Sequence, residues 1–354
     1  MKVSSVSYVY YEKNENELTL WIDFLIDRGI SSEQIALYVP YISKLLESNL
    51  PIIFEKQHLA HLIGIDENTL NKMISSPHSF YRNFNIPKKR GGFREIFSPY
   101  PSLHMCQKWI YKNILLNDKP HNACHGFTPS KSIITNAAIH IGQSSLLKID
   151  LKNFFPSIPI NWIINFFKRK GYTHNVSFYL ASLCCNNKVM AQGAPTSPYL
   201  SNLLLKGLDK RLYNLTKKYN IKYSRYADDM FFSGNYIPYD FIRVITNIIE
   251  DYGLNINKDK TAFLINANKK IITGISVNNN TLSLPREYKR KLKNELHFIK
   301  KYGYLSHINK QKIKDPNYLF SILGKINFWL QVEPMSKKAI ESKKLIISIL
   351  KMGA

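Results

Sequence analysis

The spacing of apolar residues predicts that helices make up most of the chain. The clearest repeat starts at Phe241, where apolar residues recur three and four positions apart as far as Tyr252 and Gly253 follows. A helix that is apolar on one side is expected to cover one face of a sheet. Less regular repeats of the same kind predict further helices within residues 17–49, 101–116, 132–141, 160–187, 199–215, 286–315 and 318–350.

Short runs of β-branched and aromatic residues predict strands between these helices. Residues 81–99 have the pattern of a hairpin that turns at Gly91-Gly92. Residues 222–232 have the pattern of a second hairpin, and an apolar strand ends at Asp150. The interval between them is long enough for a crossover, so the strand and the hairpin can be neighbours in one sheet. The mixture predicts an α+β fold. The remaining predicted strands are 146–149, 222–225, 230–232, 262–265 and 271–277.

Residues 54–74 have the pattern of a helix-turn-helix. An apolar helix is followed by Gly64 and then by a second helix that Asp66 can cap. Such a unit can read DNA, which would let residues 1–80 bind duplex DNA alone. Two helices packed within an N-terminal extension give the same pattern and are common.

The charge of the chain indicates a polyanionic partner. Among 354 residues, 45% of them hydrophobic, 49 are Lys or Arg and 25 are Asp or Glu, so the formal net charge is +24. The 22 Tyr and 19 Phe supply rings that can stack on bases. The excess is dense in residues 286–315, with ten basic residues against three acidic ones. A generic basic protein or a membrane-surface binder is the alternative.

Cysteine usage and hydropathy indicate a cytoplasmic protein with no membrane partner. The four cysteines form no CxxC pair, which disfavours a zinc ribbon and fits a reducing cytosol. No uncharged apolar run reaches the ~18 residues of a membrane-spanning helix. The N-terminus also lacks the apolar stretch of a secretion signal.

Three aspartates are the strongest candidates for chemistry. Asp228 and Asp229 lie at the tip of the predicted hairpin at 222–232, and Asp150 ends a buried strand. Adjacent carboxylates repel one another and a buried one loses hydration, so both arrangements need compensating cations or donors. Mg²⁺ prefers such hard oxygen ligands. Without a metal, the Asp-Asp pair would simply be a solvated turn.

The hairpin at 81–99 supplies cations suited to a triphosphate. Lys88, Lys89 and Arg94 lie on or beside its turn, where they would project from a mobile flap. A basic turn that is merely solvated has the same pattern.

A loop and an aromatic pair offer further nucleotide contacts. Gln192 and Gly193 begin the loop QGAPTSP, in which Gln192 can hydrogen-bond a base or sugar and Gly193 permits close backbone approach. Phe155 lies five residues after Asp150, where its ring can wall the sugar side of a nucleotide. The alternatives are a helix cap for the loop and core packing for the ring.

Together these motifs resemble those of reverse transcriptases. Asp150 with Phe154-Phe155, then QGAPTSP, YADD at 226–229 and GLNINKDKT at 253–261 occur in the family's order, within residues 84–277. The resemblance implies a right-hand polymerase fold with fingers, a palm with an antiparallel sheet and a helical thumb. The implied segments are a helical N-terminal extension (1–52), fingers (53–145), palm with inserted fingers helices (146–283) and basic helical thumb (284–354).

Two shorter motifs narrow the resemblance to the retron reverse transcriptases of bacteria. Residues 136–140 (NAAIH) resemble the retron NAxxH motif, and residues 272–274 (ITG) resemble VTG with Ile in place of Val. The short length, without an endonuclease or maturase module, is also similar.

The resemblance implies roles for individual residues. Asp150 and Asp228 would bridge two Mg²⁺ ions, with the Leu151 carbonyl as a further ligand. Asp229 would bind one of the ions or contact the residues that bind them. The implied dNTP-binding residues are Lys88 or Lys89, Arg94, Phe155 as the gate against a 2′-hydroxyl, Gln192, Gly193 and Lys260. The implied RNA-binding residues are Asn136, His140, Thr273 and Gly274, joined by Arg286, Lys289, Arg290 and Lys293 of the basic helix.

The retron resemblance also implies partners. A cognate noncoding RNA would be both template and primer, and synthesis from an internal guanosine 2′-hydroxyl would leave the cDNA joined to RNA. A separate effector protein would act with this product in anti-phage defence. The alternatives are another bacterial reverse transcriptase, of group II intron-like or abortive-infection type, and a non-catalytic RNA-binding scaffold. The scaffold is disfavoured because unneeded carboxylates would weaken RNA binding.

Overall fold

The computed structural model describes residues 5–88, 91–266, 269–278 and 280–352. Contacts within the chain divide it into two units. The boundaries of these units differ from those of the four predicted segments, which stay predictions. The first unit consists of Met1–Asn122, Leu151–Lys210 and Ile249–Asn255, and the second of Ala123–Asp150, Arg211–Ile248 and Ile256–Ala354.

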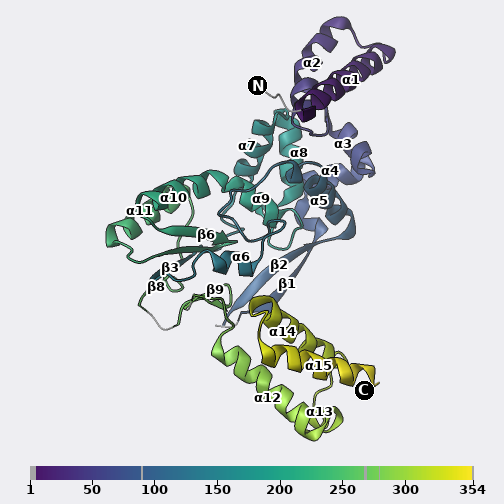
Figure 1. The fold of residues 1–354 in the computed structure, drawn as a ribbon. Helices are drawn as coiled ribbons and strands as arrows, with labels where there is room; N and C mark the ends of the chain where they lie inside the picture. Colours follow the sequence, from purple (N-terminus) through teal and green to yellow (C-terminus); the bar gives the residue numbers. More distant parts are fainter. Residues whose placement is uncertain (1–4, 89–90, 267–268, 279, 353–354) are drawn as a thin grey trace. The chain divides into compact units, whose positions relative to one another are not determined.

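The first unit is mainly helical, as the apolar spacing predicted (Figure 1). The predicted helix at 199–215 is two helices, because the first ends at Leu204 and the second begins at Lys206. The helices of this unit are α1 (Ser5–Asp27), α2 (Ser32–Glu47), α3 (Lys56–Ile63), α4 (Glu67–Ser75), η1 (Pro77–Phe80), α5 (Pro101–Asn113), η2 (Leu115–Asn117), α7 (Ile160–Lys170), α8 (His174–Cys184), α9 (Ser197–Leu204) and the start of α10 (Lys206–Lys218).

The predicted helix-turn-helix at 54–74 is present as α3 and α4. Gly64 ends α3 at a φ of +81°, and the Asp66 side chain accepts a hydrogen bond of 2.9 Å from the Thr69 N–H at the start of α4. Leu70 and Met73 of α4 are fully buried, and α4 packs against α8. This burial favours the interpretation of two packed helices over a DNA-reading unit.

Two hairpins complete the first unit. Strands β1 (Tyr81–Pro87) and β2 (Phe93–Pro99) pair antiparallel, which confirms the hairpin predicted at 81–99. The second hairpin is small and joins β4 (Cys185–Asn186) to β5 (Val189–Met190).

The second unit is built on a four-stranded antiparallel sheet in the order β6-β7-β3-β8. The predicted pairing of the strand before Asp150 with the hairpin at 222–232 is confirmed, because β3 lies beside β7. The strands of the sheet are β3 (Ser145–Asp150), β6 (Lys222–Tyr226), β7 (Asp229–Gly234) and β8 (Ala262–Ile265).

Two helices lie on opposite faces of this sheet. Phe231 and Phe232 are neighbours in β7, so their side chains point to opposite faces. The Phe232 ring lies 5.8 Å from Phe241 of α11 (Tyr239–Asp251), and the Phe231 ring lies 6.1 Å from His140, just after α6 (Ile133–Ala138). The amphipathic helix predicted from Phe241 therefore covers one face, as expected.

The continuous strand predicted at 271–277 is wrong. The chain forms a small hairpin instead, with β9 (Ile271–Ile272) and β10 (Ile275–Ser276) on either side of Thr273 and Gly274. Both turn residues have positive φ, 45° and 86° respectively. A two-residue hairpin loop of the type I′ kind needs this backbone, and glycine adopts it readily.

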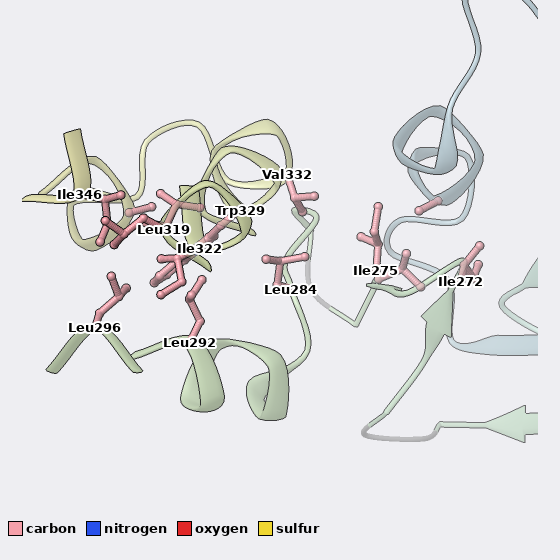
Figure 2. Close-up of a cluster of buried hydrophobic side chains, with 14 of the residues drawn as sticks. Ile272, Ile275, Leu284, Leu292, Leu296, Leu319, Ile322, Trp329, Val332 and Ile346 are labelled. Carbon is pink, nitrogen blue, oxygen red and sulfur yellow. The ribbon is translucent and has the colours of Figure 1, made fainter. Parts of the chain in front are cut away.

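The chain ends in a group of helices that shares a core with this hairpin. Leu292, Ile322 and Ile346 from three of its helices are buried in one cluster with Ile272 and Ile275 (Figure 2). The apolar residues of the helix predicted within 286–315 form its buried side, because Leu292, Leu296 and Ile299 are all buried. The helices are α12 (Arg286–Tyr302), α13 (Tyr304–Gln311), α14 (Tyr318–Val332) and α15 (Lys337–Lys351). Across the described residues, every helix is too short or too polar to cross a membrane.

Candidate active site

The YADD sequence forms a tight hairpin tip in the second unit. Tyr226, the last residue of β6, pairs with Asp229, the first residue of β7, which leaves Ala227 and Asp228 as the two loop residues. Ala227 has a φ of 57°, a conformation that disfavours a residue with a Cβ by roughly 1–2 kcal/mol. Asp228 therefore lies in the turn itself, whereas Asp229 begins the strand.

A segment between the predicted helices at 101–116 and 132–141 supports this tip. The Arg225 N–H donates to the Ala123 carbonyl at 2.8 Å, and the His125 N–H donates to the Arg225 carbonyl at 2.7 Å. A Cβ on Gly126 would lie 2.5 Å from the Ala227 nitrogen. Residues 123–126 thus run beside β6 and press against the backbone of the turn.

The side chain of Arg225 holds the turn from within. It is fully buried, and its Nη1 donates to the Ala227 carbonyl at 3.1 Å. A buried hydrogen bond from a charged donor contributes more than one between neutral groups. Arg225 and Gly126 were missed by sequence reasoning, because nothing near 126 in the sequence marks its contact with a turn a hundred residues later.

The strand register brings two of the three predicted carboxylates face to face. Asp150, the last residue of β3, is the direct partner of Asp229 in β7. Directly opposed residues of antiparallel strands point to the same face of the sheet. Asp229 also pairs with Lys148 Nζ at 3.0 Å, from the same face of β3.

Asp150 is almost fully buried and is held by two residues from the segment after α11. Its Oδ1 accepts from Asn257 Nδ2 at 2.9 Å and from Lys260 Nζ at 3.1 Å, and its carbonyl accepts from the Asn257 N–H at 2.8 Å. These contacts explain how a carboxylate can end a buried strand. Lys260, a predicted nucleotide contact, lies beside the carboxylates, and Asn257 was not predicted.

Burial raises the pKa of Asp228 above its ordinary range, and the negative charges of Asp229 and Asp150 raise it further. Burial also raises the pKa of Asp229, although the ion pair with Lys148 opposes the rise. The site therefore concentrates negative charge that Lys148 and Lys260 compensate only in part. Such a site favours a further cation.

The donor set fits Mg²⁺ bound by few protein ligands. Carboxylate oxygens suit this ion, which is commonly held by one or two carboxylates together with water and substrate phosphates. Among the described residues, no three His, Cys, Asp or Glu side chains are grouped so that they could hold a metal by themselves. Asp150 and Asp228, with substrate oxygens, match the open kind of site.

The other predicted nucleotide contacts belong to the first unit. Lys88 and Arg94 are exposed on the β1–β2 hairpin, and Phe155 is half-buried with its ring 5.2 Å from Phe154. Lys89 lies outside the described residues. Leu151, the predicted backbone ligand, is buried at the start of this unit's second segment.

The loop after β5 is fixed by the β1–β2 hairpin. The Phe97 N–H of β2 donates to the Gln192 carbonyl at 2.8 Å. A Cβ on Gly193, whose φ is +124°, would lie 2.6 Å from the Phe97 carbonyl oxygen. Glycine at 193 is thus required by the protein's own backbone, whatever nucleotide it contacts.

The two residues of the NAxxH motif are buried in the second unit. The His140 ring joins the two strands of the hairpin, because its nitrogens lie 2.6 Å from Ser233 Oγ and 2.7 Å from Ser224 Oγ. Burial lowers the pKa of His140 to about 3, so the ring is neutral at pH 7. Asn136 is fully buried, and its amide has no hydrogen-bond partner among the described residues. Neither side chain can reach RNA without moving.

The remaining predicted RNA contacts lie nearer the surface. Thr273 Oγ1 donates to the Ile133 carbonyl of α6 at 3.1 Å, and Gly274 is exposed beside it. On α12, Arg286, Arg290 and Lys293 are exposed, whereas Lys289 pairs with Glu333 at 2.9 Å.

Comparison with known proteins identifies the family. A family model described as reverse transcriptase (RNA-dependent DNA polymerase) matches residues 86–315. The chain is 32% identical over 285 residues to the retron Ec83 reverse transcriptase of Escherichia coli, covering 76% of this chain and 88% of that protein. It is 29% identical over 312 residues to the retron Ec86 reverse transcriptase of the same organism, covering 83% and 96% respectively.

A solved structure of a foamy viral protease–reverse transcriptase with double-stranded DNA has 18% identity and a TM-score of 0.43, covering 76% of this chain and 43% of that one. The family match and the observed elements confirm the predicted α+β polymerase fold. The chain belongs to the reverse transcriptase family, and it is a retron-type member of that family.

Proposed function

We propose that this RNA-directed DNA polymerase makes RNA-linked single-stranded DNA from a cognate noncoding RNA. The first step would join the 2′-oxygen of an internal guanosine to the α-phosphorus of a dNTP and break its bond to pyrophosphate. Later steps would use the 3′-hydroxyl of the growing strand. The observation that supports polymerisation best is the opposition of Asp150 and Asp229 beside the turn that presents Asp228.

Asp150 and Asp228 are the proposed ligands of two Mg²⁺ ions, with Asp229 and the Leu151 carbonyl as further ligands. Mg²⁺ held there would supply positive charge that favours deprotonation of the attacking hydroxyl and offsets the charge of the leaving pyrophosphate. Asp229 already pairs with Lys148, which favours a supporting role for it. Asn257 orients Asp150 by donating to its Oδ1 at 2.9 Å.

The ammonium group of Lys260 is proposed to leave Asp150 and pair with the pyrophosphate. Its side chain is half-exposed, so it can leave the ion pair when a cation takes its place at the carboxylate. The other proposed dNTP contacts are Lys88, Lys89, Arg94, Gln192 and Gly193, with Phe155 as the gate against a 2′-hydroxyl.

RNA recognition is proposed for α12 and for the β9–β10 turn. Arg286, Arg290 and Lys293 offer three exposed cations on one helix, which suits a phosphate backbone. Lys289 and the turn residues Thr273 and Gly274 are proposed to act beside them. Asn136 and His140 are proposed to support recognition by positioning the hairpin, because both side chains are buried.

A nucleic-acid extraction tests this proposal. The protein is expressed with its flanking locus, and the co-purifying nucleic acid is run on a denaturing gel with and without RNase. The proposal predicts a DNase-sensitive band that shortens but survives RNase and is missing from an Asp228→Ala, Asp229→Ala variant. DNA of unchanged length after RNase would instead support a reverse transcriptase that primes from a DNA end or a protein. RNA alone in both samples would support the non-catalytic scaffold.

The proposed role in anti-phage defence is tested by plaque counts. Cells that carry the whole locus, with its separate effector protein, are expected to resist phage, and the same locus with Asp228→Ala is expected to lose resistance. Equal plaque numbers for the two loci would exclude a defence role that depends on DNA synthesis.

A further inference from the structure

The first unit contains a cavity of about 520 Å³ that none of the proposed catalytic, dNTP-binding or RNA-binding residues line. Its volume lies in the range of ordinary small-ligand pockets. One side of α7 forms a wall, since Trp162, Asn165, Phe166 and Arg169 follow at the spacing that places residues on one helix face. The same helix is buried on its other side through Ile163 and Phe167.

Two aromatic rings from different segments line the cavity beside glycine backbone. A Cβ on Gly207 would lie 2.9 Å from Tyr252 Oη, and one on Gly253 would lie 3.7 Å from Trp162 Cζ2. A larger residue at Gly207 would crowd the Tyr252 ring, whereas the contact at Gly253 is an ordinary van der Waals distance. Trp162 and Tyr252 are half-buried, so each keeps part of its surface open to a ligand.

The charges that line the cavity are mostly positive. Asp118 accepts hydrogen bonds from Lys170 Nζ at 2.7 Å and from Lys206 Nζ at 3.0 Å, so this lining carboxylate is shared by two lysines. Arg169 is exposed and has no ion-pair partner among the described residues. Three cations against one anion leave an excess of two positive charges for a ligand.

We propose that this cavity binds a nucleotide, with its base on the ring of Trp162 or Tyr252 and its phosphate at Arg169 and Lys206. Every base has a flat face that stacks on aromatic rings, and guanidinium matches the geometry of phosphate. The exposed Asn165 amide is placed on the same helix face to hydrogen-bond the edge of the base. A purely apolar ligand would make no use of Arg169 and Asn165, and an acidic peptide would not use the rings.

The nucleotide can be free, or it can be an unpaired nucleotide within an RNA or DNA strand. Photocrosslinking distinguishes these sources, because 5-iodouracil couples to aromatic side chains that stack on it. The probes are 5-iodouridine monophosphate and a tetranucleotide with one 5-iodouridine, each mixed with the full chain. Mass spectrometry is expected to find a crosslink at Trp162 or Tyr252. Reaction with both probes indicates a free nucleotide, and reaction with the tetranucleotide alone indicates a strand.

Arg169→Ala is expected to lower the yield of this crosslink about tenfold, the loss expected for one charged hydrogen bond. Lys168→Ala is the matched control, because Lys168 is an exposed cation of α7 that does not line the cavity. Both variants are expected to extend a supplied primer–template like the wild type, which shows that the fold is intact. The proposal would be overturned if neither probe formed a crosslink to Trp162 or Tyr252. Equal crosslink yields in the two variants would also overturn it.

Discussion

Single residues around the YADD turn decide whether its backbone can form. Ala227 holds a positive φ, the buried Arg225 donates to its carbonyl, and Gly126 lies against its nitrogen. Both contacts are made with Ala227, which directly precedes Asp228 in the turn. The position of the predicted catalytic carboxylate is therefore fixed by residues that do not take part in the chemistry.

Gly126→Ala is expected to lower DNA synthesis by about 100-fold, because its Cβ would push the turn and a shift near 1 Å at a catalytic group has this effect. Primer extension measures the rate, and binding of the cognate RNA is expected to change little. Gly324→Ala in α14 is the control, since a Cβ there meets no atom within 4 Å. Equal rates for the two variants would contradict the account of the turn.

His140 makes the stability of the fold depend on pH in a defined direction. Its pKa is about 3 in the folded protein against 6.5 when unfolded, so the unfolded chain binds the proton more readily. The contribution of the neutral His140 ring to the free energy of unfolding is complete above pH 6.5. It is lost progressively as the pH drops from 6.5 towards 3. Denaturant unfolding across this range is expected to show a shallower fall in His140→Gln than in the wild type. An identical pH dependence in the two would disprove the buried neutral ring.

Elements with a strong local pattern could be predicted from the sequence, whereas contacts between distant segments could not. The helix from Phe241, the hairpin at 81–99 and the sheet containing Asp150 were all correct, because apolar periodicity and turn residues are local signals. The pairing of residues 123–126 with Arg225 has no such signal. Thr273 and Gly274 were assigned to a strand because their β-branched neighbours favour strands, and a turn of only two residues interrupts that pattern too briefly to be recognised.

At the scale of elements, Glu333 ties together three segments of the second unit. It accepts hydrogen bonds from the Leu284 N–H at 2.8 Å, from Lys289 Nζ at 2.9 Å and from Trp329 Nε1 at 3.0 Å. Glu333→Ala is expected to destabilise the protein by about 1–3 kcal/mol, since it leaves buried donors unpaired. Thermal unfolding compares it with Glu341→Ala, an exposed glutamate of α15. Equal melting temperatures would show that these bonds contribute nothing.

For the whole molecule, the net charge of +24 makes nucleic-acid binding strongly dependent on salt. If α12 contacts the RNA backbone, removing Arg286, Arg290 and Lys293 together is expected to reduce the slope of log affinity against log salt by about 2–3. Filter binding between low and physiological salt measures the slope. Removal of Lys337, Lys338 and Lys344 from α15 deletes the same charge elsewhere. A similar change in both triple variants would mean that only total charge matters.

The catalytic role of Asp228 is tested most directly by incorporation of a labelled dNTP on a supplied RNA template with a DNA primer. The assay contains Mg²⁺ and compares the wild type with Asp228→Asn. Asparagine keeps the shape of the side chain and removes its charge. We expect Mg²⁺-dependent synthesis by the wild type and a loss of about 100- to 1,000-fold or more in the variant, with RNA binding largely intact. Synthesis at the wild-type rate by Asp228→Asn would contradict the assignment of the YADD turn as the catalytic centre.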